Sequence, residues 1–375
     1  MRLQPFELER FQSLHEHSVE INLSESGVEP LTLRELLDSD DRLEALLDRP
    51  LEYVQTNGTR PLRAAIAALY PGAQIDEVQV TNGGSEANLL VCLGLVEPGD
   101  EVVLMLPNYL QTQGLVRGLG ALVHPWPLRL DEADGRWRAD PEELERLVGE
   151  RTRAVLICNP NNPTGATLDA AELDRICGIA DRHGAWVVSD EIYRGAEVDG
   201  VETPTVHGRY ERVVVTSGLS KAYGLPGLRV GWIVGPAADV ERFWRCRDYT
   251  TIANGALSDH LATFALDVAR PRLLQRARDR IRANLGVVRA FLDERPDEFV
   301  YVPPRAGAIL WAAYARDVPS VDLAERLRME KDVLLVPGSH FDVEGHVRLG
   351  FGGDPVLLRE GLSRIGDIFD QLPDG

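Results

Sequence analysis

Short apolar runs alternate along the first two thirds of the chain with amphipathic stretches. The runs are rich in valine, leucine and isoleucine and end in turn residues; they cover 101–107 (EVVLMLP), 153–160 (RAVLICNP), 185–190 (AWVVSD), 212–217 (RVVVTS) and 228–235 (LRVGWIVG). Continuous apolar runs of this length are typical of strands that are buried on both faces. Between them, the pattern of 168–183 predicts a helix that Gly184 ends. Strands that alternate with helices predict a mostly parallel α/β sheet.

The pattern changes after about residue 265. A long, arginine-rich helical pattern covers 270–295, and it is followed by shorter predicted strands and helices at 308–314, 321–330, 333–337, 347–351 and 355–372. These elements predict a second, α+β domain that the first 45 or so residues join. We therefore expect a large domain over 46–280, and a small domain over 1–45 and 281–375 that includes an N-terminal arm.

Polar stretches follow three of the predicted strands. They are 159–165 (NPNNPTG), 190–194 (DEIYR) and 217–221 (SGLSK). In an open α/β sheet the ligand crevice lies at the carboxyl ends of the strands. Polar residues that are far apart in the sequence are therefore expected to converge on one crevice.

The charge of the chain limits its partners. The formal net charge is −19, so that nucleic acid and anionic membrane surfaces would be repelled. The apolar fraction of 44% is ordinary for a globular protein, and no apolar run reaches the roughly 18 residues that a bilayer span requires. We expect small-molecule partners, with no nucleic acid and no membrane.

Cysteine usage and the N-terminal residues indicate a compartment. Cys92, Cys158, Cys177 and Cys246 form no CxxC pair and have apolar neighbours. Buried free thiols suit a reducing compartment. The first residues include no apolar segment of signal-peptide length. These observations predict a cytoplasmic protein.

Lys221 is unusual in this chain, which contains two lysines, Lys221 and Lys331, and 38 arginines. Arginine therefore serves as the general surface cation, yet a lysine stands at 221 among small residues, glycines and a proline. An arginine stays protonated near neutral pH, whereas a desolvated lysine can lose its proton and attack a carbonyl to form a Schiff base. A solvated surface lysine is the alternative interpretation.

Two further charged residues lie close to these strand ends. Asp190 ends the run 185–190, where its carboxylate could cap a helix or meet a positively charged partner such as a protonated ring nitrogen. Arg229 lies eight residues after Lys221, and its planar fork of donors suits a phosphate. A structural ion pair is the alternative for Arg229.

Other motifs are compatible with a bound cofactor. The stretch 81–88 (TNGGSEAN) precedes a predicted helix, and glycines and a serine at a helix N-terminus form either an anion site or a simple cap. The stretch 158–165 (CNPNNPTG) is either a turn or a rigid holder for an amide donor. Tyr109 follows a strand and is either a core residue or a stacking surface for a flat ring.

Several common motifs are absent from the sequence. There is no GxGxxG and no GxxxxGK[ST], which weakens a dinucleotide or nucleoside triphosphate interpretation. There is no GxSxG. The eight histidines show no metal-ligand spacing, so that no metal site is predicted.

Taken together and in order, these motifs resemble the fold type I family of pyridoxal phosphate (PLP) enzymes, in its class I/II, aspartate-aminotransferase-like group. The similarity runs over nearly the whole chain. It implies a PLP-dependent transferase fold of type I, with a mostly parallel seven-stranded sheet in the large domain. The run 228–235 would be the antiparallel member of that sheet.

The resemblance implies a role for each matching residue. Lys221 would bind PLP as a Schiff base and later shuttle a proton at the substrate α-carbon. Asp190 would pair with the ring nitrogen, Tyr193 and Asn162 would hydrogen-bond the ring hydroxyl, and Tyr109 would stack on the ring. The residues implied around the phosphate are Gly84, Ser85, Ser217, Ser220 and Arg229.

Further matches concern the substrate and a second subunit. Tyr53, in YVQTNGTRPLR, matches a tyrosine that reaches the phosphate in the neighbouring subunit, so that a homodimer is implied. Arg348, in HVRLGFGG, matches the arginine that binds the substrate α-carboxylate. Gly27 would lie beside that carboxylate, and Asn162 would also contact the substrate.

Two features depart from the usual family pattern. Gly218 stands where many members have a serine, which leaves both Ser217 and Ser220 as candidate phosphate contacts. The segment 24–31 (SESGVEPL) resembles a subgroup that includes capreomycidine synthase, a cyclase.

The expected function is a PLP-dependent aminotransferase that moves an amino group between an L-amino acid and a 2-oxo acid in ping-pong order. The alternative is a PLP-dependent lyase or cyclase that diverts the same first steps to β- or γ-elimination or ring closure. A non-catalytic PLP-fold module, such as the effector domain of a regulator, is disfavoured by the acidic charge and by the presence of Lys221.

Overall fold

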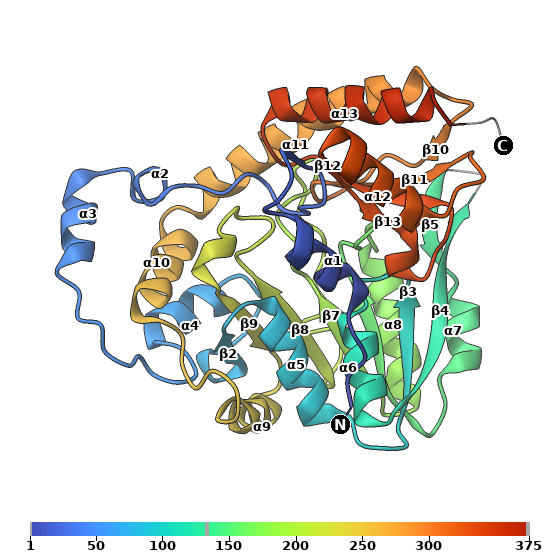
Figure 1. Cartoon of the computed structure of the whole chain (residues 1–375). Helices are drawn as coiled ribbons and strands as arrows, with labels where there is room; N and C mark the ends of the chain where they lie inside the picture. Colours follow the sequence, from blue (N-terminus) through green and yellow to red (C-terminus); the bar gives the residue numbers. More distant parts are fainter. Residues whose placement is uncertain (1, 132–134, 373–375) are drawn as a thin grey trace.

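A computed structural model describes residues 2–131 and 135–372 of the chain (Figure 1). One large mixed sheet forms the centre of the molecule, and a smaller antiparallel sheet lies beside it with helices α11, α12 and α13. Within the described residues, no helix is long and apolar enough to cross a membrane.

The large sheet has eight strands in the order β2-β9-β8-β7-β6-β3-β4-β5. Their bounds are β2 Val78–Thr81, β3 Glu101–Leu106, β4 Leu122–Asp131, β5 Arg136–Ala139, β6 Thr152–Cys158, β7 Trp186–Asp190, β8 Val213–Gly218 and β9 Gly231–Val234. β3, β4, β6, β7 and β8 are joined by parallel pairings, as the sequence predicts. β9 pairs antiparallel with both β2 and β8, which confirms the antiparallel member expected within 228–235.

The sheet has one strand more than the seven expected. The additional strand is β5, which pairs antiparallel with Leu128–Asp131 of β4. It is a short extension at the sheet edge, and its sequence, RWRA, contains no run of apolar residues that would predict a buried strand.

Helices cover both faces of the large sheet because successive strand residues point to opposite faces. In β3, Val102 and Leu104 pack in one core with α5, α6 and α9, whereas Val103 and Met105 pack in the other with α4, α7, α8 and α10. This two-sided burial explains the continuous apolar runs. The helices are α4 Arg60–Ala67, α5 Gly84–Leu95, α6 Gln111–Leu119, α7 Pro141–Leu147, α8 Ala170–Arg182, α9 Ala237–Arg247, α10 Ala256–Asp267 and α11 Arg270–Asp293.

The smaller sheet has the order β10-β11-β14-β13 and is antiparallel throughout. Its region contains β10 Phe299–Tyr301, β11 Ile309–Tyr314, α12 Ser320–Lys331, β12 Val333–Leu334, β13 Val336–Pro337, β14 His346–Gly350 and α13 Pro355–Phe369. Both chain ends meet here, because β1 (Ile21–Asn22) pairs in parallel with β12. The boundary predicted at residue 280 falls within α11, which continues from one sheet region to the other.

The N-terminal segment lies partly over the large sheet and partly away from it. α1 (Glu7–His15) lies between the two sheets (Figure 1). α2 (Leu33–Leu37) and α3 (Asp40–Leu47) project from the body of the molecule, and the chain then returns to α4. Leu47, Leu51 and Tyr53 on this projecting segment are exposed by 75%, 82% and 89%.

Candidate active site

A cavity of about 310 Å³ lies at the carboxyl ends of the large sheet's parallel strands. Its size is in the range of small-molecule and cofactor pockets. It brings together residues that lie as far apart in the sequence as Gly84 and Arg348. Ten of the predicted site residues line it: Gly84, Ser85, Tyr109, Asn162, Asp190, Tyr193, Ser220, Lys221, Arg229 and Arg348.

Lys221 follows β8, and its amino group faces Glu25. Lys221 Nζ lies 2.7 Å from Glu25 Oε1, and the backbone N–H groups of Ser26 and Gly27 donate to the same oxygen at 2.9 Å. Burial raises the pKa of Glu25, but Lys221, the Gly27 N–H and Arg348 lower it to about 2. Burial lowers the pKa of Lys221, but Glu25 and Tyr193 offset this, so that the net shift is upward. The pair is therefore ionised in this state.

Asp190 ends β7 and points its carboxylate into the cavity. Asn88 Nδ2 donates to Asp190 Oδ2 at 3.1 Å, and the Ile192 N–H donates to Asp190 Oδ1 at 3.0 Å. Asn88 is itself held by Thr216, whose hydroxyl donates to Asn88 Oδ1 at 2.7 Å. Burial raises the pKa of Asp190, whereas the Asn88 and Ile192 hydrogen bonds lower it. A fixed and partly desolvated carboxylate of this kind can pair with a cation in the cavity.

The start of α5 and Arg229 form a site for an anion. Gly83 precedes the helix with φ +91° and provides no side-chain cap, so that the first N–H groups remain available near Gly84 and Ser85. A β-carbon at Gly83 would collide with the Arg229 guanidinium, and one at Gly231 would collide with the Gly83 backbone. Arg229 adopts φ +51°, an unusual conformation for a non-glycine residue. These close approaches bring the guanidinium to the helix N-terminus.

Arg348, on β14, enters the cavity from the smaller sheet. Only 1% of its surface is exposed, which is rare for a charged residue. Its Nη1 donates to Asn162 Oδ1 at 3.0 Å and its Nη2 donates to the Ser24 carbonyl at 2.6 Å. Its buried Nε has no hydrogen-bond partner among the described residues. A buried guanidinium with an unused donor indicates an anionic ligand.

Two tyrosines border the same space. Tyr193 is buried and follows Asp190 by three residues; burial raises the pKa of its hydroxyl, which Lys221 and Arg348 partly offset. The Tyr109 hydroxyl donates to Glu9 Oε1 at 2.6 Å, and Phe6 packs edge-on against the Tyr109 ring at 4.9 Å between centroids. The N-terminal arm thus contacts the residue that is predicted to stack on a ring.

Three predicted residues do not line the cavity. The hydroxyl of Ser217 donates to the Glu191 carbonyl at 3.1 Å, whereas Ser220 does line the cavity. Tyr53 lies on the exposed segment between α3 and α4. Gly27 lies close by, since a β-carbon there would be 3.5 Å from Lys221 Cδ. The roles of these three residues stay predictions, as do those of the ten residues that line the cavity.

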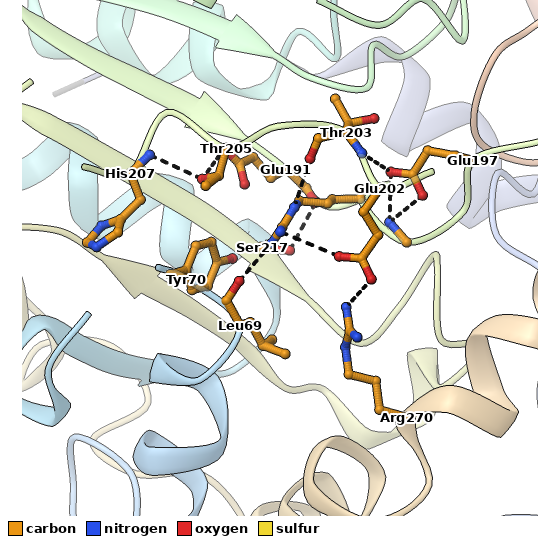
Figure 2. A network of polar contacts seen from close by, with 12 residues as sticks. Leu69, Tyr70, Glu191, Glu197, Glu202, Thr203, Thr205, His207, Ser217 and Arg270 are labelled. Carbon is orange, nitrogen blue, oxygen red and sulfur yellow. Dashed lines mark hydrogen bonds and ion pairs between the residues drawn. The ribbon is translucent and has the colours of Figure 1, made fainter. Parts of the chain in front are cut away.

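A buried polar network supports the loop that follows β7 (Figure 2). Glu191 is fully buried; the Thr205 hydroxyl and the Val206 N–H donate to its Oε1 at 2.8 and 3.1 Å. Its Oε2 has no hydrogen-bond partner among the described residues. Burial raises the pKa of Glu191 to about 7, although Arg194 and the two hydrogen bonds oppose this shift. The network fixes the backbone directly beside Asp190.

Several residues of the cavity were not predicted as site residues. They are Leu8, Glu9, Gln12, Glu16, Glu25, Ser26, Asn88, Cys158, Ile192 and Pro226. Asn88 is the last residue of the motif 81–88, four residues after Gly84, so that helical spacing places both on neighbouring turns. Glu25 lies two residues before Gly27, in the segment 24–31. Glu9 and Glu16 come from the N-terminal arm, where no pattern in the sequence indicates a site.

The chain matches known proteins along most of its length. The family model for aminotransferases of class I and II matches residues 21–365. Capreomycidine synthase from Streptomyces vinaceus is 32% identical over 92% of this chain and 89% of its own. An aspartate aminotransferase from Streptomyces avermitilis is 31% identical over 86% and 82%. The crystal structure of a PLP-dependent aminotransferase from Streptococcus suis has a TM-score of 0.93 and 32% identity, with both chains fully covered.

These matches agree with the geometry of the cavity, where a lysine, a carboxylate at a strand end and a helix N-terminus with an arginine face one another. Gly218, which stands where many family members have a serine, packs against the backbone of Val230 and Gly231, so that a β-carbon there would lie 2.8 Å from the Val230 carbonyl oxygen. The chain belongs to the class I and II aminotransferase family and is a PLP-dependent aminotransferase.

Proposed function

We propose that the cavity residues hold PLP in the way that the sequence motifs imply. When bound, PLP supplies an electron-withdrawing ring that stabilises negative charge at the substrate α-carbon. Lys221 Nζ is the amine in the cavity that would bind the cofactor aldehyde. The Asp190 carboxylate, held by Asn88 and Ile192, would face the ring nitrogen and keep it protonated. Tyr193 and Asn162 would donate to the ring hydroxyl, and Tyr109 would cover the ring.

The phosphate would occupy the anion site at the start of α5. A phosphate carries about two negative charges, which a helix N-terminus and one bidentate arginine can balance. Gly84, Ser85 and Arg229 line this part of the cavity together with Ser220. We retain Ser217 as a further candidate, because its backbone carbonyl lies 3.8 Å from where a Gly84 β-carbon would stand.

Arg348 would bind the substrate α-carboxylate, with Asn162 and the Gly27 segment beside it. The free Nε and the two oriented terminal nitrogens form a fork that matches a carboxylate. Binding there would orient the substrate so that its α-carbon proton faces Lys221. Lys221 Nζ, once free, would accept that proton and return it at the cofactor carbon.

The single observation that carries this proposal is the presence of Lys221, Asp190 and the under-bonded Arg348 in one cavity. The products follow from where the proton goes. If Lys221 returned the proton on the cofactor side, the substrate would leave as a 2-oxo acid, and its amino group would pass to a second 2-oxo acid. The overall reaction would then be transamination in ping-pong order.

A PLP-dependent lyase or cyclase is the second candidate, because a capreomycidine synthase is among the relatives that cover nearly the whole chain. Transamination and the lyase or cyclase reaction differ in their products and in the final form of the cofactor. The enzyme loaded with PLP is mixed with single L-amino acids, and cofactor and products are identified. Transamination predicts conversion of the cofactor to its amino form with stoichiometric 2-oxo acid. A cyclic product, or pyruvate and ammonia with an unchanged cofactor, would establish the second candidate instead.

We also propose a homodimer in which Tyr53 reaches the phosphate site of the partner subunit. The support is the exposed apolar segment at Leu47, Leu51 and Tyr53, together with Tyr249 at 92% exposure and Ile252 at 49%. A test is to mix two inactive variants, Lys221→Ala and Tyr53→Ala. Only a mixed dimer regains one complete site, so activity of about a quarter of the wild type is expected from random pairing. No recovery, in a sample that sediments as a monomer, would contradict the proposal.

For localisation we propose the cytoplasm. All four cysteines are free, and Cys92, Cys158 and Cys177 are buried, which suits a reducing compartment. Burial raises the pKa of the Cys92 thiol to about 12, so that it stays protonated and unreactive.

For the domains, we keep the division at residues 45 and 280 as a proposal, with α11 as the element that joins the two parts.

A further inference from the structure

Three glutamates line one side of the cavity. Glu9 lies on α1, Glu16 follows the end of α1, and Glu25 lies in the loop between β1 and α2. Glu9 accepts the Tyr109 hydroxyl, and Glu16 contacts His17 at 3.5 Å. All three are carried by the N-terminal segment, so that this segment gives the cavity an acidic wall.

The cations of the cavity are already assigned to other partners. Among the described residues that line it, these cations are Lys221, Arg229 and Arg348. In the proposed function, Lys221 binds the cofactor, Arg229 binds the phosphate and Arg348 binds the α-carboxylate. No lining cation of this subunit then remains for an acidic substrate side chain, which would instead face the glutamates.

Glu25 is the member of the acidic wall whose surroundings change most when the cofactor binds. In the structure its only side-chain partner among the described residues is Lys221, at 2.7 Å. The proposed function takes that amine away, because Lys221 then binds the cofactor. The Ser26 and Gly27 N–H groups still hold the carboxylate in place. The carboxylate, still oriented by these two N–H groups, would thus face the substrate space without the amine that is its partner in the structure.

A second observation places a ligand in the same space. The buried Nε of Arg348 lacks a partner among the described residues, which indicates a ligand carboxylate at that end of the cavity. Arg348 and Glu25 are close enough for the charge of each to shift the pKa of the other. A ligand that satisfies both carries a carboxylate for Arg348 and a cation for Glu25.

We propose that Glu25, assisted by Glu9 and Glu16, selects amino-acid substrates whose side chain ends in a guanidinium or ammonium group. This inference rests on the proposed function, since it requires that Lys221, Arg229 and Arg348 be occupied as described there. The side-chain cation would replace Lys221 as the partner of Glu25. Charge-assisted hydrogen bonds of this type are among the stronger polar contacts in proteins.

The test compares L-arginine with L-citrulline, which has the same length and planar shape but a neutral end group. The rate of cofactor conversion in the PLP-loaded enzyme gives kcat/KM for each. We expect a preference of about 10- to 100-fold for arginine in the wild type, the size of one hydrogen bond to a charged group. In Glu25→Gln the preference should fall close to one. Glu7→Gln is the matched control, because Glu7 is an exposed glutamate of α1 that does not line the cavity.

The ratio of kcat/KM for arginine to kcat/KM for citrulline separates substrate selectivity from any effect of the substitution on Lys221. Both substrates need the same lysine, so a general loss of activity in Glu25→Gln cancels in the ratio. If Glu25 instead pairs with the α-ammonium group that every amino acid has, both rates fall equally, the ratio is unchanged and the proposal is overturned. A wild-type preference of one or less also overturns it, and that result requires no variant.

A binding measurement keeps the inference distinct from the proposed function. If no amino acid converts the cofactor, the proposed function fails, and calorimetric titration of the Lys221→Ala protein with arginine and citrulline then decides the inference. Tighter binding of arginine supports it, whereas equal binding or no binding of either overturns it. If Glu25→Gln does not fold, Glu9→Gln and Glu16→Gln replace it. The expected drop in the preference for arginine over citrulline is then smaller, about two- to fivefold. An unchanged preference in both variants overturns the contribution of the acidic wall.

Discussion

Lys221 Nζ and Glu25 Oε1 lie 2.7 Å apart, although their residues are separated by 196 positions in the sequence. The N-terminal segment and the loop after β8 therefore meet at the amine that is proposed to bind the cofactor. The Glu25 carboxylate stabilises the protonated form of this amine, and so opposes its attack on an aldehyde. Cofactor binding should consequently involve loss of a proton from Lys221 and release of Glu25.

Removing the carboxylate should therefore speed attachment of the cofactor. In Glu25→Gln the negative charge that raises the pKa of Lys221 is lost, while burial, which lowers this pKa, remains. A larger fraction of Lys221 is then neutral at a given pH. We expect the pH at which cofactor attachment is half-maximal in rate to move downward by about one unit. Stopped-flow mixing of cofactor-free enzyme with PLP across pH 6 to 10 measures this, and an unchanged profile would contradict the role of the pair.

Asp190→Asn should leave the fold intact and slow the reaction. The amide can keep the contact with the Ile192 N–H, but it cannot provide a negative charge to a protonated ring nitrogen. We expect kcat to fall by about 100-fold or more, comparable to loss of one preorganised electrostatic contact. Single-turnover kinetics with an amino acid measures the loss. Asn88→Ala, which removes the donor to Asp190 Oδ2, should show a smaller loss in the same assay.

Gly83→Ala should weaken phosphate binding more than backbone strain alone would. The matched control is Gly99→Ala. Gly83 and Gly99 have φ of +91° and +92°, so that both lose the conformational freedom of glycine, but a β-carbon at Gly99 meets nothing within 4 Å. At Gly83 the β-carbon collides with the Arg229 guanidinium. Equilibrium dialysis should show a Kd for PLP that rises about tenfold or more in Gly83→Ala and little in Gly99→Ala; similar values for both variants would remove Arg229 from the phosphate site.

Arg348→Lys should impair substrate binding while preserving the cofactor. A lysine keeps one positive charge but loses the planar fork, so that the contacts to Asn162 and to a carboxylate cannot be made together. We expect kcat/KM to fall by about 100-fold, mainly through KM. The affinity for PLP should stay within about twofold of wild type. A loss of PLP binding of similar size would show that Arg348 serves the cofactor site.

Glu191 should make the protein less stable as the pH rises. Burial raises its pKa from 4.5 to about 7, so that the native state binds more protons than the unfolded chain between these values. This contribution to stability is complete below pH 4.5 and is lost as the pH rises through 7, on the order of 3 kcal/mol in total. Glu191→Gln keeps the Thr205 and Val206 hydrogen bonds, so its unfolding free energy should fall less between pH 5 and pH 8. Urea unfolding at both pH values, with the exposed Glu44→Gln as control, measures the difference.

The sequence predicted the parts of the fold that two-sided burial determines. The runs at 101–107, 153–160 and 185–190 became β3, β6 and β7 because both of their faces are covered by helices. β4 was missed, since Pro125 and Pro127 argue against a strand. Both prolines lie in the part of β4 that pairs with β3 alone, before the residues that pair with β5, so that one edge of the strand needs no ladder hydrogen bonds there.

The site was predictable where a residue follows a strand or starts a helix, as with Asp190, Lys221 and Gly84. Glu25 was not, because its importance comes from a contact with a residue 196 positions away, and no local pattern encodes it. The same holds for Glu9 on α1, whose contact with Tyr109 depends on how the N-terminal arm packs over the large sheet.

The central claim is that Lys221 binds the cofactor, and this chain offers an internal control for it. Lys331 is its only other lysine, and it does not line the cavity. Its Nζ lies 2.7 Å from Oδ2 of Asp367, a residue of α13. The PLP-loaded enzyme is reduced with borohydride, digested and examined by mass spectrometry. We predict the cofactor mass on the peptide that contains Lys221 and none on the peptide that contains Lys331. Two results together would contradict this account. The label would lie on Lys331 or on neither lysine, and the Lys221→Ala variant would still convert amino acids.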